Sequence, residues 1–216
     1  FANDSLFAFA ALERAKNTPY RQYDVYQYLC YEYGEARTAQ DSVMLEKTFE
    51  EGMQVFPDSA FFLNNLINTY IYSNRNEKAL EMLNVAIQKN PNDANLYNVM
   101  GRVYETGLKD YANAEKNFQI ALEKDPNLTD ALSNIGRIYY NQGVNKLSEA
   151  NMINDSKKYQ EELGMAKDLF KKALPYYKKA HEAEPEKMDN MIALRGIYYN
   201  LNMGPELEAI EAEMNK

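Results

Sequence analysis

The residue types that usually carry catalysis or bind metals are scarce in this sequence. His181 is the only histidine and Cys30 the only cysteine, which argues against a histidine metal cluster or a histidine-based triad. Cys30 has no base spaced nearby that could activate its thiol, and we interpret it as a compact packing residue. Glycine-rich phosphate loops and EF-hand loops are also missing. The sequence therefore predicts no enzyme, no metal and no cofactor.

The overall charge restricts the kinds of partner. The formal net charge is −8 and the pI is near 4.9, whereas binding to nucleic acid or to anionic lipid needs a basic surface. The lysines near residues 157–172 alternate with acids, which favours a solvated face over a membrane-surface helix. No apolar run approaches the roughly 18 residues that a membrane span requires. We expect no nucleic acid partner, no direct membrane span, and a basic or amphipathic protein or peptide partner.

Helical patterns in this chain end at prolines with regular spacing. Pro91 lies 34 residues after Pro57, and Pro126 lies 35 residues after Pro91. Pro185 follows after 59 residues, which is one period plus about 25. A proline inside a helix removes a hydrogen bond and clashes with the preceding turn, so each proline is expected to separate two helices. The spacing predicts a helical repeat.

The same residue classes recur within each period. Glycine and alanine fall where two antiparallel helices would approach closely, and tyrosine and phenylalanine fall where they would fill the space between hairpins. The clearest period contains, in order, Tyr97, Met100, Gly101, Tyr104, Ala114, Phe118, Ala121 and Pro126. This pattern resembles the tetratricopeptide repeat (TPR). The resemblance implies an all-α fold, a right-handed α-α superhelix (TPR solenoid) with one elongated hairpin.

We expect one solenoid over residues 1–216, in which each hairpin buries its apolar face against its neighbours. Pro205 suits the first turn of a last helix, whose Leu207, Ile210 and Met214 should face inward. The expected parts are a truncated preceding repeat (1–22), four repeats (23–57, 58–91, 92–126 and 127–185) and a capping hairpin (186–216).

An insertion of about 25 residues interrupts the fourth repeat, at about residues 144–172. Helix formers lie on both sides of "NDS", and Asp155 or Ser156 can cap a new helix. We therefore expect both helices to be extended into a projecting arm, with Pro175 bending the second near its base. This oversized hairpin and the wording "ALPYYKKAHEAEP" resemble TPR proteins of bacterial cell envelopes. The resemblance implies a bacterial periplasm or cell envelope location, with a targeting segment removed before Phe1.

In TPR proteins the first helix of each hairpin lines a concave groove. The resemblance places eight residues there, and asparagine and arginine among them could bind a peptide backbone or a carboxylate. The chaperone-binding carboxylate clamp of some TPR domains is not expected, because Asp130, Asn134 and Val99 differ from its pattern. The predicted groove residues are Asn64, Asn68, Asn98, Arg102, Ser133, Arg137, Tyr140 and Asn141.

These features favour a non-enzymatic protein-protein interaction scaffold that binds a peptide segment or a partner helix in the groove. The arm would provide a second contact or a homodimer surface. The alternative is a carbohydrate-binding accessory of a bacterial envelope glycan-uptake system, with Tyr140 and Tyr199 as stacking platforms. The absence of tryptophan weighs against that alternative.

Overall fold

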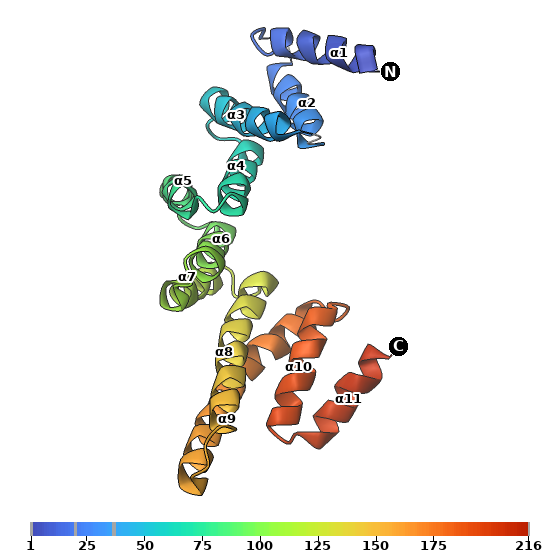
Figure 1. Cartoon of the computed structure of the whole chain (residues 1–216). Coiled ribbons are helices and arrows are strands. Elements are labelled where there is room, and N and C mark those ends of the chain that lie inside the picture. The colour runs from blue at the N-terminus through green and yellow to red at the C-terminus, as the bar shows by residue number, and fades with distance from the viewer. Residues whose placement is uncertain (1, 20, 36–37, 216) are drawn as a thin grey trace. The chain divides into compact units, whose positions relative to one another are not determined.

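The computed structural model describes residues 2–19, 21–35 and 38–215, and the side chains from residue 9 onward. The described residues form helices and turns without any strand, as the sequence predicts (Figure 1). The chain divides into two compact units, Phe1–Asn84 and Val85–Lys216, and each is considered by itself below. None of the described helices combines the length and the apolar character needed to cross a bilayer.

The first unit is built from short helices around a cluster of aromatic rings. Phe62 is fully buried, and its ring lies where a side chain on Gly52 would otherwise be. Tyr26 and Phe56 pack against the same ring. Cys30 is also buried here, and burial raises the pKa of its thiol to about 12, so the thiol is protonated and unreactive at neutral pH. The helices are α1 (Ala2–Ala15), α2 (Gln22–Gly34), α3 (Ala39–Val55), α4 (Ala60–Tyr72) and α5 (Asn76–Lys89), of which α5 continues past Asn84.

The second unit carries most of the candidate site. Its helices are α6 (Ala94–Arg102), the π-helical turn η1 (Val103–Gly107), α7 (Tyr111–Lys124), α8 (Thr129–Ala150), α9 (Ser156–Ala183), α10 (Met188–Asn200) and α11 (Gly204–Met214). The chain turns at Pro126 between α7 and α8, as its position between two helical patterns predicts. Pro205 lies in the first turn of α11, with Ile210 buried and Leu207 and Met214 packed against the same core. The predicted inward face of this last helix is confirmed.

Close helix crossings explain the glycines of the repeat pattern. A Cβ atom on Gly101 would lie 2.5 Å from the ring of Phe118, and one on Gly136 would lie 2.8 Å from the ring of Tyr177. Such distances are well below van der Waals contact, so only glycine allows these rings to lie flat against the facing helix. Phe118 is fully buried as a result.

The elongated hairpin predicted from the insertion is present. Helix α8 has 22 residues and α9 has 28, and they pack along each other (Figure 1). Asp155 caps α9 by accepting a hydrogen bond from the backbone N–H of Lys158, and Lys146 bridges the helices through Glu162 at 2.8 Å. Pro175 lies within α9, which is continuous around it. The repeat boundaries themselves stay predictions.

Three turns inside hairpins use a residue in the left-handed backbone region, namely Asn74, Lys109 and Asn202. This conformation costs an ordinary L-residue about 1 to 2 kcal/mol, and asparagine tolerates it better than lysine. Lys109 is therefore the least suited of the three. Its φ of 57° is a conformation that glycine adopts readily.

Lys109→Gly is accordingly expected to raise the free energy of unfolding by roughly 0.5 to 1 kcal/mol, measured by urea denaturation followed by circular dichroism. The control is Lys116→Gly, because Lys116 is also exposed but lies inside α7. There glycine should destabilise by about 1 kcal/mol. Equal effects of the two substitutions would show that the turn geometry does not matter.

Candidate functional site

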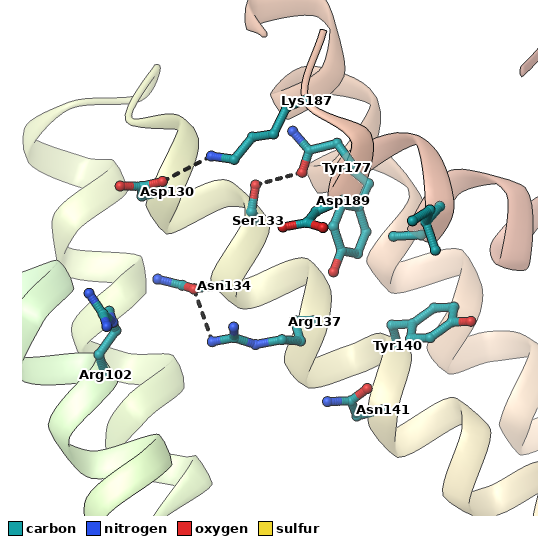
Figure 2. A pocket seen from close by; sticks show the side chains of 13 residues that line it. Arg102, Asp130, Ser133, Asn134, Arg137, Tyr140, Asn141, Tyr177, Lys187 and Asp189 are labelled. Atoms are coloured by element: carbon teal, nitrogen blue, oxygen red, sulfur yellow. Dashed lines mark hydrogen bonds and ion pairs between the residues drawn. The ribbon is translucent and has the colours of Figure 1, made fainter. Parts of the chain in front are cut away.

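Five of the eight predicted groove residues line one cavity of about 480 Å³ in the second unit. Arg102 comes from the end of α6, and the other four come from α8 (Figure 2). The opposite wall consists of Tyr177 from α9 and of residues at the start of α10. The five predicted residues at the cavity are Arg102, Ser133, Arg137, Tyr140 and Asn141.

Helix α8 presents these residues together because of their spacing. Ser133, Arg137, Tyr140 and Asn141 follow one another at intervals of four, three and one residue, which places them on one helical face. The opposite face of α8 carries the buried residues Leu132, Ile135 and Ile138. The burial of that apolar face against α7 and α9 fixes the orientation of the polar one.

Arg137 is engaged within the protein rather than free. Its Nε and Nη2 donate to the two carboxylate oxygens of Glu105 at 3.1 and 2.6 Å, and Nη2 also donates to Oδ1 of Asn134 at 3.0 Å. Glu105 belongs to η1 and is only 7% exposed. The two arginines predicted to bind a ligand therefore differ: Arg137 is ion-paired with Glu105, whereas Arg102 has no ion pair in the described part of the chain.

Asn98 occupies a different place from the one predicted. It is buried, and its Oδ1 accepts a hydrogen bond from Nδ2 of Asn134 at 2.9 Å. Asn98 thus holds the side chain of Asn134 through this hydrogen bond and does not itself line the cavity. Asn64 and Asn68 are exposed on α4 of the first unit, where their role stays a prediction.

Sequence reasoning missed several polar residues at or beside the cavity, among them Glu105, Tyr177, Lys187, Asp189 and Asn190. Glu105 follows Arg102 by three residues and Asn98 by seven, which would place it on their face of a regular helix, but the π turn that holds it and its pairing with Arg137 have no signal in the sequence. Lys187 donates to Asp130 and Glu184 at 3.1 and 3.0 Å.

Tyr177 and Asn190 form the buried part of the wall. Burial raises the pKa of Tyr177 to about 12, so its hydroxyl is protonated at neutral pH and can donate a hydrogen bond. Figure 2 shows that hydroxyl pointing toward the space between Arg137 and Tyr140. Asn190 is 1% exposed and its Oδ1 accepts from Ser133 at 2.9 Å. Its Nδ2 has no hydrogen-bond partner among the described residues, although a buried amide normally has one.

The two tyrosines considered for sugar stacking do not share a surface. The hydroxyl of Tyr140 lies against Gly196, and its ring packs edge-on against Phe170 with ring centres 5.6 Å apart. Tyr199 is 71% exposed and lines a separate cavity with Leu163 and Met203. The structure thus offers no single platform made from both rings.

The described residues offer no candidate metal site. They contain no cluster of three histidine, cysteine, aspartate or glutamate side chains that could hold a metal ion. His181 lies between α9 and α11 with its Nε2 at 3.3 Å from Glu213.

Helices paired into hairpins, with small residues at the crossings, define a TPR-like helical-repeat protein. Solved structures with a similar fold include two crystal structures of MamA. The first has 15% identity and a TM-score of 0.57 over 87% of this chain and 88% of MamA. The second has 16% identity and a TM-score of 0.55 over 84% and 91%. A third, MamA from MSR-1, has 21% identity and a TM-score of 0.51 over 85% and 89%.

MamA is a TPR-repeat protein, so these similarities agree with the fold inferred from the repeat pattern. At such identities they concern the fold alone. Comparison with protein-family models and with curated proteins gives no match. What the site does must therefore be argued from its own geometry.

Proposed function

We propose that this chain is a protein-interaction module that binds an extended peptide segment of a partner in the cavity between α6, α8 and α10. The cavity wall carries amide, hydroxyl and guanidinium groups from several helices. These groups suit the alternating donors and acceptors of a peptide backbone.

The observation that carries this proposal is the state of Asn190. Asn190 lines the cavity, and its buried Nδ2 has no hydrogen-bond partner among the described residues; an unsatisfied buried donor costs free energy. A carbonyl oxygen of a bound peptide would satisfy it after a small movement of the side chain. The protonated hydroxyl of Tyr177 provides a second donor in the wall of the cavity.

The lining charges are mixed, with Arg102, Arg137 and Lys187 facing Asp130 and Asp189. A cavity of this kind does not select strongly for net charge, in contrast to a basic clamp. Such a cavity suits a partner segment that is recognised mainly through its backbone.

The experiment is a selection from a random peptide display library, followed by titration calorimetry of the selected peptides. Arg102→Ala should weaken binding by roughly 10- to 150-fold, since a hydrogen bond from a charged group contributes roughly 1.5 to 3 kcal/mol. Arg195→Ala is the control, because Arg195 is also exposed on a helix of this unit but lies outside the cavity. The proposal fails if no peptide is enriched, or if both variants bind like the wild type.

A further inference from the structure

The pairing of Arg137 leaves a defined set of donors for a ligand. A guanidinium group has five N–H donors. The N–H of Nε and one of Nη2 go to Glu105, and the other of Nη2 goes to Asn134. Only the two N–H groups of Nη1 remain, and the side chain of Arg137 is 42% exposed. Figure 2 shows Arg137 at the cavity with its hydrogen bond to Asn134.

Glu105, the partner of Arg137, belongs to the π-helical turn η1. Leu108 N–H donates to the carbonyl of Val103 at 3.2 Å, which is the wider hydrogen bonding of a π turn. Such turns are rare and concentrate at functional sites. Arg102, directly before the turn, is exposed, whereas Glu105 within the turn is buried. A buried carboxylate requires a close cation, so Glu105 and Arg137 hold each other in place.

The positive charge of Arg137 is therefore balanced by the carboxylate of Glu105, whereas the two N–H groups of its Nη1 are free to bind a ligand. An uncharged carbonyl oxygen can accept a hydrogen bond from Nη1 without a further electrostatic cost. A ligand carboxylate at the same position would approach the buried carboxylate of Glu105, and like charges repel.

The other charges of the cavity do not reverse this preference. Lys187 is paired with Asp130 and Glu184. Arg102 and Asp189 remain, and they have opposite signs. The wall as a whole is close to electrically neutral despite its three cationic side chains.

We propose that Glu105 determines the charge selectivity of the cavity, so that it accepts uncharged peptide segments, with backbone or Asn and Gln carbonyls on Arg137, and rejects acidic ones. This inference rests on the proposed peptide-binding function and names the class of segment. Glu105 acts through Arg137 and is thus a positioning residue.

The test uses arrays of acetylated and amidated octapeptides that occur in pairs, identical except for Gln or Glu at one central position. Blocked ends remove the terminal charges. The quantity measured is the ratio of the affinities for the Gln and Glu members of each bound pair. The wild type should prefer the Gln member about tenfold, and Glu105→Gln should prefer the Glu member, because Arg137 is then uncompensated.

Two further variants separate selectivity from general effects. Glu123→Gln changes the net charge equally, but Glu123 is exposed on α7 away from the cavity, so its ratio should equal that of the wild type. The double variant Glu105→Gln/Arg137→Gln removes both charges and should retain the preference for Gln. Thermal melts establish that each variant is folded at the temperature of the assay.

The outcomes are distinct. Binding with the same ratio in wild type and Glu105→Gln would overturn the role of Glu105 and leave the peptide-binding proposal standing. A reversal in Glu123→Gln as well would assign the effect to net charge and also overturn it. Absence of binding to every peptide by all four folded proteins would overturn both proposals.

Discussion

Replacing Phe170 with alanine is expected to lower the free energy of unfolding by about 3 to 5 kcal/mol. The side chain is 1% exposed and belongs to the core that joins α8, α9 and α10, together with Leu194 and Ile197. A Cβ atom on Gly143 would lie only 3.0 Å from its ring, so α8 fits closely around it. Removal of the ring leaves a cavity that these rigid helices cannot close.

The measurement is urea denaturation monitored by circular dichroism, with Met165→Ala as the control. Met165 lies on the same helix and is half exposed, so its loss should cost less than about 1 kcal/mol. A Phe170→Ala variant as stable as this control would show that the base of the arm is not part of the core.

Replacing Gly101 with leucine should destabilise the protein by about 3 kcal/mol, which is the upper range for overpacking a tight crossing. The first added atom alone would lie 2.5 Å from the ring of Phe118. Phe118 is fully buried between α7 and its neighbours, so it has no space to move away.

Gly164→Leu is the matched control, because a Cβ atom on Gly164 meets nothing within 4 Å. Gly164 lies inside α9, where leucine has a higher helix propensity than glycine by roughly 1 kcal/mol. Opposite shifts in the melting temperature are therefore expected for the two substitutions. A Gly101→Leu variant that melts like the wild type would show that α6 and α7 do not cross closely at Gly101.

Much of the fold follows from local patterns in the sequence. The spacing of Pro91 and Pro126 and the glycine at position 101 are set by contacts within a hairpin, and these repeat from one hairpin to the next. The long hairpin could be predicted because helix formers and the capping Asp155 flank a short polar turn. Local signals of this kind need no knowledge of distant packing.

The candidate site was only partly predictable. The helical face of α8 brings Ser133, Arg137 and Tyr140 to one cavity, and this spacing is visible in the sequence; their role there stays a prediction. The burial of Asn98 and the pairing of Arg137 with Glu105 depend on how α6 and η1 pack against α8. A π turn shifts the helical register by one residue, and no residue type signals it in advance. Pairings between side chains of different helices cannot be predicted from the periodicity of residue types along one helix.

The continuity of α8 has a mechanical consequence. The helix carries Asn141 in the cavity and ends nine residues later at Ala150, about 14 Å further along the same axis. A load applied to the end of the arm would therefore act through a stiff rod on the cavity wall. If the cavity binds a peptide as proposed, tilting that rod would move the residues that contact it, and the arm would serve as a lever.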